Sequence, residues 1–441
     1  MSGTTRSDRT SVDANAHHAD DETIRVLRPR RAAPADAVRP TRAEINLGAV
    51  RHNLHVLRRA LQTQGVTASA PSIWGVLKAD AYGHGAPAVA RTLERAKIDG
   101  LCVALLEEAI ELRSAGITIP ILVMGGYFGP AHRGLEEVLE HDLTPVLYHP
   151  DQIERLATLT RDRNLETRPA FHVKVDTGMA RLGAAPTNVD ALFDVIADHR
   201  ELEFRGLMSH LACADDPEPG PTNLQLRAFA DVRERARRHR LVPQVCHIAN
   251  SAAALAYPST RFDAVRPGIA LYGVSPFFGR SSVADAALSA SGELRPVMRV
   301  RTEIVALRDL AAGDAVGYCH TWRASSPRRI ATVPMGYADG LTRSLSNKGA
   351  MLVRGRRAPI VGVVSMDLTT IDVTDIPGAA LGDEVVVLGS QEPPRAPLIA
   401  DNADRTAAAI TAEEIAQHTG TIPWEVVTNI SRRVPRFYRE P

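Results

Sequence analysis

Eight short apolar runs alternate with amphipathic helical stretches along the first part of the chain and predict an α/β fold built on a (β/α)8 TIM-type barrel. The later part shows alternating hydrophobicity and turn glycines, which predict a mainly antiparallel β C-terminal domain. A doubly wound open sheet is the alternative for the first part. At 441 residues, 44% of them hydrophobic, the chain is long enough for two such domains.

The barrel strands are predicted wherever a short run is rich in β-branched residues and ends at a polar or turn residue. Helical stretches at 107–115 and 224–239 fit the crossover connections between such strands. The predicted strands are residues 72–77, 100–104, 119–124, 144–148, 170–175, 204–209, 244–248 and 262–266.

The rest of the chain divides by composition. Residues 1–40 are polar, mixed in charge and without periodicity, which predicts a disordered tail. We expect the barrel at 41–288 and the β-domain at 289–441, with a Ser/Ala/Gly-rich linker or long loop at 275–296. In the β-domain, strands are expected within 298–310, 329–340, 351–374 and 382–390. One helix is expected at 411–418, capped by Thr411 with Glu414 closing a capping box.

Composition restricts the class of partner. The net charge is +1, so nothing draws the chain as a whole to nucleic acid or anionic lipid, and we expect a small-molecule partner. The four cysteines are scattered, which argues against a disulfide framework or structural zinc. Neither a membrane-spanning run nor a signal peptide is evident, and we expect a cytoplasmic protein.

Chemically active side chains end several predicted barrel strands, and parallel barrels carry their active sites at that end. Lys78 either ends a strand and reaches water, or it is an amine of lowered pKa that forms a Schiff base with a carbonyl compound. The grouping at one end of the barrel favours the second interpretation. The other residues at these ends are Lys174, Asp176, His210, His247, Asn250, Ser251 and Arg266.

A phosphorylated aldehyde cofactor suits such a lysine. Ser251 and the turn at Gly268 and Ile269 offer a hydroxyl and backbone N–H groups to a phosphate. The motifs of serine hydrolases, P-loop proteins, dinucleotide-binding folds and zinc proteases do not occur in the sequence.

Ordered sequence blocks from about residue 41 to 438 resemble the alanine racemase family. The resemblance implies pyridoxal 5′-phosphate on Lys78 and interconversion of L- and D-alanine, which supplies D-alanine for peptidoglycan. It also implies a head-to-tail homodimer with active sites shared between subunits. The blocks are VLKADAYGHG (76–85), HVKVDTGMARLG (172–183), HIANSAAA (247–254), VRPGIALYG (265–273), GYCHTW (317–322), MGYADG (335–340) and VSMD (364–367).

The resemblance assigns two catalytic bases. Lys78 would be one, and Tyr318 of the partner subunit would be the other, because racemisation needs a base on each face of a planar carbanion. Arg266 matches an arginine that faces the pyridine nitrogen and, as a pure donor, leaves that nitrogen unprotonated. His210 matches a histidine that links the catalytic tyrosine to this arginine.

Further positions match groups that hold cofactor or substrate. Lys174 matches a lysine that is often carbamylated and then holds Arg181 against the substrate carboxylate. The remaining cofactor-binding positions would be Tyr82, His247, Ser251, Gly268 and Ile269. The substrate would meet Met366, Tyr337 and Asp367, and the resemblance implies no metal.

Some residues depart from the family pattern: Cys319 stands where glycine is common, Leu368 where glutamine is common, and Arg432 where some members have a phosphate-contacting tyrosine. They leave open a related racemase of broader small-amino-acid specificity. A non-catalytic single-barrel protein that binds the same cofactor is another alternative, but such proteins lack a second domain. The barrel decarboxylases that use this cofactor are a further alternative. The sequence pattern around their C-terminal catalytic cysteine has no match in this chain.

Overall fold

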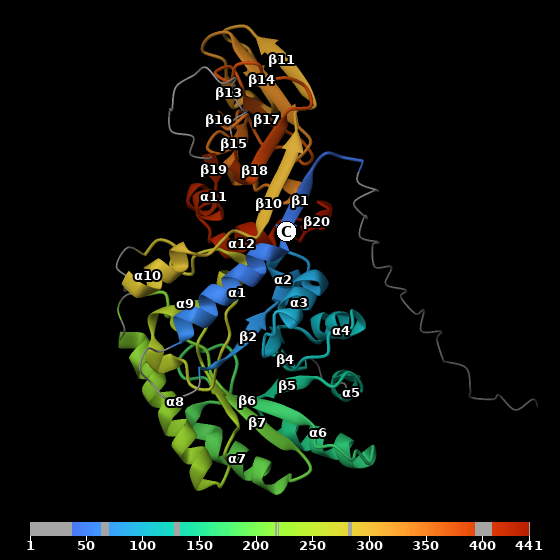
Figure 1. Ribbon diagram of the computed structural model, residues 1–441, viewed down its shortest axis with the longest axis vertical. Helices are drawn as coiled ribbons and strands as arrows, with labels where there is room; N and C mark the ends of the chain where they lie inside the picture. The colour runs from blue at the N-terminus through green and yellow to red at the C-terminus, as the bar shows by residue number, and fades with distance from the viewer. Residues whose placement is uncertain are drawn as a thin grey trace, which may run out of the picture.

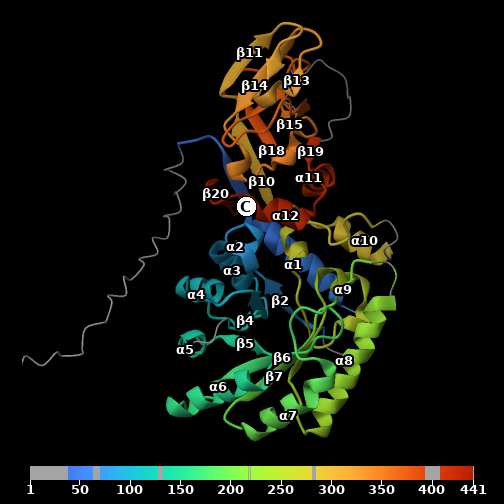
Figure 2. The ribbon, with the colours of Figure 1, turned by 180° about the vertical axis from the view of Figure 1, so that it is seen from behind.

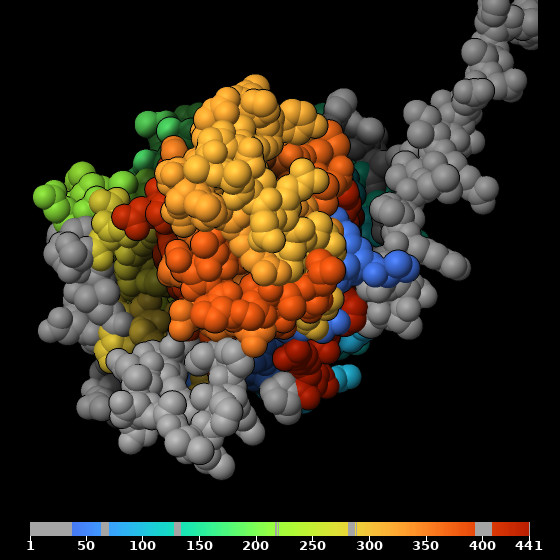
Figure 3. Space-filling view, turned by 90° about the horizontal axis from the view of Figure 1, so that it is seen from above, coloured from blue at the N-terminus to red at the C-terminus, as the bar shows by residue number. Residues whose placement is uncertain are grey.

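The computed structural model describes residues 38–62, 70–127, 133–216, 218, 220–280, 285–392 and 408–440. Residues 1–37, most of the predicted tail, lie outside the described part. The molecule has two lobes, a barrel and a β-domain, and from above the yellow-to-orange β-domain lies over the barrel (Figures 1, 2 and 3).

The barrel confirms the predicted fold class. Its eight parallel strands pair in chain order, and the last strand returns to pair with the first. The Asp263 and Arg266 N–H groups donate to the Cys246 and Ala249 carbonyl oxygens, which brings the remaining pair of edges together. The strands are β2 (Ser72–Val76), β3 (Gly100–Val103), β4 (Ile121–Val123), β5 (Thr144–Leu147), β6 (Ala170–Lys174), β7 (Glu203–Met208), β8 (Val245–His247) and β9 (Ala264–Val265).

Helices cover the outside of the barrel (Figure 1). The two predicted helical stretches fall on α4 (Leu106–Ser114) and α8 (Gly220–Arg238). The stretch predicted as a linker contains helix α10, because Ala and Ser are acceptable helix formers once the apolar face packs. The helices are α1 (Leu47–Leu61), α2 (Lys78–Tyr82), α3 (Ala86–Arg95), α4 (Leu106–Ser114), α5 (Arg133–Glu140), α6 (Pro150–Asp162), α7 (Val189–Asp198), α8 (Gly220–Arg238), α9 (Ser251–Ala256) and α10 (Asp285–Gly292).

The β-domain confirms the predicted antiparallel architecture. Its larger sheet has the order β16-β15-β18-β10-β1-β20 with β19 beside β18, and a smaller sheet has the order β11-β14-β17. The strands are β10 (Met298–Glu303), β11 (Ala306–Leu310), β12 (Ala315–Val316), β13 (Trp322–Arg323), β14 (Arg328–Val333), β15 (Ala350–Val353), β16 (Arg356–Pro359), β17 (Thr369–Asp372), β18 (Glu384–Gln391), β19 (Ala408–Ile410) and β20 (Arg436–Arg439).

Two helices belong to this domain, α11 (Ala412–Thr419) and α12 (Pro423–Thr428). Thr411 caps α11 as predicted, since its side chain accepts from the Glu414 N–H. The prediction that Glu414 closes a capping box is wrong. The Glu414 carboxylate accepts from both Arg357 terminal nitrogens, at 2.6 and 2.7 Å, and a two-point bond to a guanidinium is stronger than one to a single backbone N–H.

Strand β1 (Arg42–Asn46) was not predicted, and it lies in the larger sheet of the β-domain. It pairs antiparallel with β10 and parallel with β20. The chain then enters α1 directly, with Asn46 as the helix cap. The domain limits at 40/41 and 288/289 therefore stay a prediction. Strand β1 belongs to the β-domain sheet but precedes the barrel in the chain.

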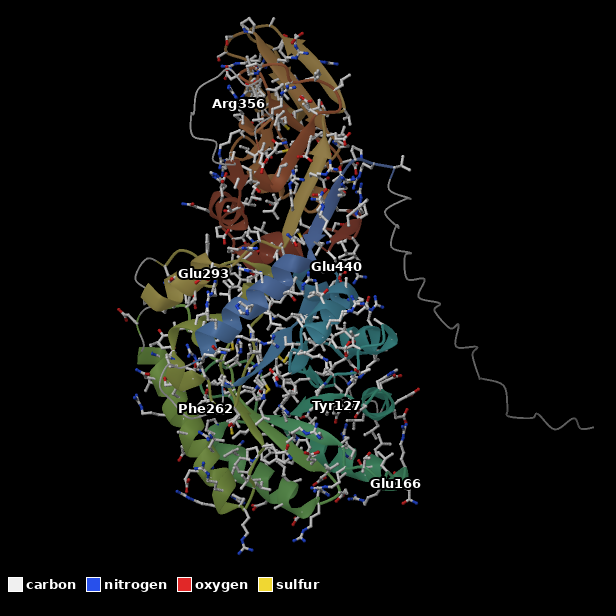
Figure 4. All side chains as sticks on the ribbon, viewed as in Figure 1. Tyr127, Glu166, Phe262, Glu293, Arg356 and Glu440 are labelled. Atoms are coloured by element: carbon white, nitrogen blue, oxygen red, sulfur yellow. The ribbon has the colours of Figure 1, made fainter. Side chains whose placement is uncertain are left out.

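Close backbone contacts join the lobes. Gly83 has φ +80°, and a Cβ there would lie 2.6 Å from the Val427 carbonyl oxygen of α12. A Cβ on Gly340, in the β-domain, would lie 2.2 Å from the Asn429 carbonyl oxygen. Arg436 of β20 donates from Nε to the Gly83 carbonyl oxygen at 3.0 Å, and Glu440 follows at the same junction (Figure 4). The segment from α12 to β20 thus contacts both the barrel and the β-domain.

Candidate active site

A cavity of about 670 Å³ opens at the carboxyl ends of the barrel strands. It is large enough for a cofactor with a small substrate. Most of the barrel residues predicted from the sequence meet there. Those that line it are Lys78, Tyr82, Arg181, His210, Ser251, Arg266, Gly268 and Ile269.

Lys78 begins an unusual backbone turn. Ala79, Asp80, Ala81 and Tyr82 all have φ between +53° and +55°, so α2 is one turn of left-handed helix. This conformation costs about 1–2 kcal/mol per non-glycine residue, and side groups must hold it. Glu108 accepts from the Ala79 N–H at 2.5 Å, and the Asp80 carboxylate accepts from the Ala86 N–H at 2.7 Å.

Lys78 is exposed and lines the cavity. Partial burial, and then the positive charge of Arg181, lower the pKa of Lys78, whereas Glu108 acts in the opposite direction. A lowered pKa raises the fraction of neutral amine, the form that attacks carbonyl carbon. The structure therefore gives this lysine the environment of a reactive amine.

Arg266 is 3% exposed and lies at the floor of the cavity. It donates to the Ser209 carbonyl oxygen at 2.8 Å and contacts His247 Nδ1 at 2.6 Å and His210 Nδ1 at 3.3 Å. Burial lowers the pKa of Arg266 to about 10, which still leaves it charged at neutral pH. No carboxylate of the described residues forms an ion pair with it, so the floor is a buried cation open to an anionic or electron-rich ligand.

His210 and His247 are neutral. Burial, followed by the charge of Arg266, lowers the pKa of His210 to about 3, and the same causes hold the pKa of His247 well below its usual range. His210 lines the cavity. His247 lies behind Arg266, where it supports the guanidinium rather than the cavity wall.

Lys174 ends β6 and is 7% exposed. Burial and the charges of Arg181 and Arg266 lower its pKa to about 8. The loop after it is shaped by Asp176, whose carboxylate accepts from the Gly178, Met179 and Arg181 N–H groups. The positive charges of two guanidinium groups disfavour a charged amine at this position and would favour an anion there.

Ser251 begins α9, and Asn250 caps that helix by accepting from the Ala253 N–H. The Ser251 hydroxyl oxygen accepts from the Gly268 N–H at 2.9 Å. A Cβ on Gly268 would lie 2.4 Å from the Tyr82 hydroxyl oxygen, so only glycine lets the phenol approach this turn. Hydroxyl groups and backbone N–H groups are thereby gathered on one wall.

The predicted residues of the β-domain do not meet this cavity. Tyr318, Tyr337 and Met366 are 69%, 42% and 52% exposed. Tyr337 and Met366 lie together, because the Tyr337 and Ala338 N–H groups donate to the Ser365 and Met366 carbonyl oxygens. Asp367 pairs with Arg433 at 2.7 Å. One chain thus carries two separate groups of predicted site residues.

The departing residues are also at the surface of the β-domain. Cys319 has φ +59°, a conformation that favours glycine, and it follows the exposed Tyr318. Leu368 is 47% exposed, and Arg432 is exposed.

Two sets of residues near the cavity were not predicted. The α12 segment adds Ile422, Trp424, Glu425, Thr428 and Asn429 to the rim. The sequence gives only a weak indication of this helix, because Pro423 in its first turn is the only local residue that favours a helix start. The second is His172, which contacts His247. It precedes Lys174 by two residues on β6, and that period-two spacing places both on one face of the strand.

The structure also bears on the broader predictions. All four cysteines are free. Within the described ranges no group of three or more His, Cys, Asp or Glu side chains could hold a metal ion. No helix in the part of the chain that the structure covers has the length and apolar character needed to cross a membrane.

Comparison with known proteins gives a consistent result. The model of the alanine racemase N-terminal domain matches residues 45–276, and that of the C-terminal domain matches residues 297–438. The alanine racemase of Sorangium cellulosum is 58% identical over 92% of this chain and 100% of its own length.

Solved structures agree. The alanine racemase from Streptomyces coelicolor A3(2) superposes with a TM-score of 0.80 at 34% identity, over 92% of this chain and 100% of that one. The Bartonella henselae alanine racemase, solved with covalently bound pyridoxal phosphate, has a TM-score of 0.75 at 30% identity, over 91% and 99%. With both domain models, this relative and these structures matched over nearly their whole lengths, the chain belongs to the alanine racemase family of isomerases.

Proposed function

We propose that the protein interconverts L- and D-alanine with pyridoxal 5′-phosphate attached to Lys78. The observation that carries the proposal is the cavity itself, which Lys78, of lowered pKa, lines together with Arg181 and Arg266. Lys174 does not line the cavity, but burial and then the charges of these three nearby residues lower its pKa. Such an excess of cations calls for an anionic cofactor and an anionic substrate carboxylate.

The residues present fit this cofactor. The wall formed by Ser251, Gly268 and Ile269 offers the Ser251 O–H as a donor suited to a phosphate, and the Gly268 N–H, which donates to the Ser251 oxygen, lies beside it. The buried, carboxylate-free guanidinium of Arg266 suits a ring nitrogen that accepts a hydrogen bond. The family relative from Bartonella henselae carries this cofactor covalently bound, which supports the same assignment here.

When bound, pyridoxal 5′-phosphate supplies an electron-withdrawing ring that acidifies the α-proton of an attached amino acid. In the proposal, the Lys78 amine removes or returns that proton on one face, and the Tyr318 hydroxyl does so on the other. Arg181 holds the substrate carboxylate. His210, neutral and bound through Nδ1 to Arg266, keeps its Nε2–H for the Tyr318 oxygen.

A homodimer completes this site in the proposal. Tyr318 is 69% exposed on the β-domain and does not line the cavity of its own chain. Tyr337, Met366 and Asp367 lie on the same domain. A second copy, placed head to tail, would bring these residues to the cavity and remove their apolar surface from water.

Lys174 is proposed to be carbamylated. Its pKa of about 8 leaves a usable fraction of neutral amine at neutral pH, and that amine adds to carbon dioxide with release of one proton. The product is an anion, so a repulsion between Lys174 and Arg181 becomes an attraction that fixes Arg181.

The physiological part of the proposal is D-alanine supply for peptidoglycan in the cytoplasm, a location that four free thiols suit. Leu368 and Arg432, both exposed on the β-domain, support a second candidate of broader small-amino-acid specificity. The ratio of kcat/KM for alanine to that for serine separates the two.

The test is an absorbance scan of the purified protein with and without borohydride, followed by chiral analysis after L-alanine is added in deuterated water. The expected result is a visible absorbance band that borohydride abolishes while it attaches the cofactor permanently to Lys78. Deuterated D-alanine is the expected product. Cofactor bound without D-alanine would overturn racemisation of alanine, and no bound cofactor would overturn the whole proposal.

A further inference from the structure

Behind the cavity floor, three buried side chains form a row. Arg266 NH1 lies 2.6 Å from His247 Nδ1, and His247 Nε2 lies 2.8 Å from His172 Nδ1. His172 is fully buried and His247 is 2% exposed. The row therefore runs from Arg266 at the cavity into the barrel interior, out of contact with solvent.

Donors and acceptors in this row have a single consistent order. A guanidinium group only donates, so His247 Nδ1 must accept and carries no proton. Neutral His247 then carries its proton on Nε2, which donates to His172 Nδ1. His172 in turn is neutral with its proton on Nε2. Each imidazole thus has its tautomer set by the neighbour nearer to Arg266.

The last donor of the row has no acceptor. His172 Nε2 is buried and has no hydrogen-bond partner among the residues that the structure describes. The Trp74 ring lies beside it, with ring centroids 5.7 Å apart and tilted by 50°. An unpaired buried donor reduces stability, so an apolar side chain would serve packing better at this position. Packing alone therefore does not account for His172.

The backbone around His172 is adapted to its ring. The pairing of β6 with β7 shifts register between Phe171 and His172, a bulge that redirects a side chain. Across the pair, a Cβ on Gly206 would lie 2.4 Å from His172 Nδ1. Gly206 has no positive φ that would require glycine, so the space that it leaves is filled by the imidazole.

We propose that His172 is a positioning residue for the racemisation reaction: by accepting from His247 Nε2–H it keeps His247 Nδ1 bare, and thereby holds Arg266 under the cofactor ring. The inference rests on the proposed function. Two neutral imidazoles orient the guanidinium without offsetting its positive charge, whereas a carboxylate would offset it. Without His172, the His247 Nε2–H loses its acceptor. The alternative tautomer then places an N–H against Arg266 and displaces it.

The test compares three variants of the cofactor-loaded enzyme. His172→Phe keeps a ring and removes the acceptor, whereas His172→Asn keeps an acceptor oxygen near the position of Nδ1. Phe171→Leu is the matched control, because Phe171 is equally buried in the same strand but packs on Phe204 at 5.8 Å, away from the row.

We expect His172→Phe to lower kcat by on the order of 10–100-fold with KM nearly unchanged. His172→Asn should recover most of that loss, and Phe171→Leu should lose stability with kcat near that of the unmodified enzyme. Neutron diffraction on the loaded enzyme should place hydrogen on Nε2 of both His247 and His172.

Hydrogen found on Nδ1 of either imidazole would overturn the inference, as would equal kcat values for His172→Phe and Phe171→Leu. An unmodified enzyme that binds no cofactor or forms no D-alanine would instead overturn the proposed function. An active enzyme whose His172→Phe variant keeps full kcat would overturn only the role of His172.

Discussion

The barrel and the β-domain carry predicted site residues in opposite ways. In the barrel, Lys78, Arg181, His210 and Arg266 come from four different strand ends and meet in one cavity. In the β-domain, Tyr318, Tyr337 and Met366 lie on the surface and meet no cavity with the barrel residues of their own chain. The barrel is a nearly complete binding site, whereas the β-domain presents groups that need another surface to act on.

This difference indicates how the work is divided. A parallel barrel brings strand ends together whatever the sequence separation, so a cofactor site can form within one chain. Under the proposed function, the second base acts on the opposite face of the substrate. Tyr318, which lies outside the cavity of its own chain, would reach that face from a second copy.

The largest effect is expected from Lys78→Ala, which removes the reactive amine of the barrel. Racemisation should fall by at least ~10⁴-fold, and borohydride should no longer attach cofactor to the chain. Chiral chromatography and mass spectrometry of the reduced protein measure both. Retained racemisation would show that the barrel is not the centre of the chemistry.

Tyr318→Phe removes the proposed second base and leaves the barrel residues unchanged. We expect bound cofactor and a loss of about 10²–10⁴-fold, greatest in the direction that starts from L-alanine. Loss of cofactor along with activity would assign Tyr318 to binding instead.

Mixing the two variants tests whether the sites are shared. A dimer with one Lys78→Ala chain and one Tyr318→Phe chain has one site with both native residues. An equal mixture that exchanges subunits should therefore recover about a quarter of full activity. No recovery, with mixed dimers verified by mass spectrometry, would place both bases in one chain.

The junction is tested by Gly83→Ala, which adds a Cβ 2.6 Å from a backbone oxygen of α12 at φ +80°. We expect the free energy of unfolding to fall by roughly 2–4 kcal/mol. Gly116→Ala is the control, because Gly116 has φ +85° and no atom within 4 Å of its added Cβ, so only backbone strain of roughly 1 kcal/mol applies. Equal losses in urea titrations would mean that the contact with α12 is not tight.

The smallest effect concerns Lys174. Its pKa is about 8 in the folded protein against 10.5 in the unfolded chain, so between these values the unfolded chain binds more protons. The cost of burying the charged Lys174 amine is therefore fully present below the folded-state pKa and is lost as the pH rises through this window. The free energy of unfolding rises with pH over the same range. In cofactor-free protein and carbon-dioxide-free buffer, unmodified Lys174 should add roughly 1–3 kcal/mol over this range, and Lys174→Met should lack that rise. Parallel curves for the two proteins would contradict the assigned pKa.

The sequence predicted the barrel because each strand is a short β-branched run that ends at a polar residue, a local signal that does not depend on distant contacts. The same logic located Lys78, His210 and Arg266. It missed β1, whose partners β10 and β20 lie more than 250 residues away along the chain. It also missed the left-handed turn after Lys78, since Ala79 and Ala81 disfavour positive φ and the turn is held by bonds to Glu108 and Ala86, which lie outside it.

Other failures have the same origin. Glu414 was assigned to a local cap, but Arg357, on strand β16 and distant in sequence, binds it more strongly. His172 was visible in the sequence and carried no distinguishing mark, because its contacts are with Gly206 and His247, two residues from other barrel strands.

Strand β1 also has a consequence for how the chain reaches its fold. The barrel strands pair with neighbours in sequence, so the barrel can form while the rest of the chain is still being made. The larger β-sheet cannot, since its strand β1 emerges first and waits for β10 and then β20. During that interval both edges of β1 are unpaired. A fragment that begins at residue 289 would leave the facing edges of β10 and β20 open, so the β-domain is not a separable module unless residues 42–46 are supplied with it.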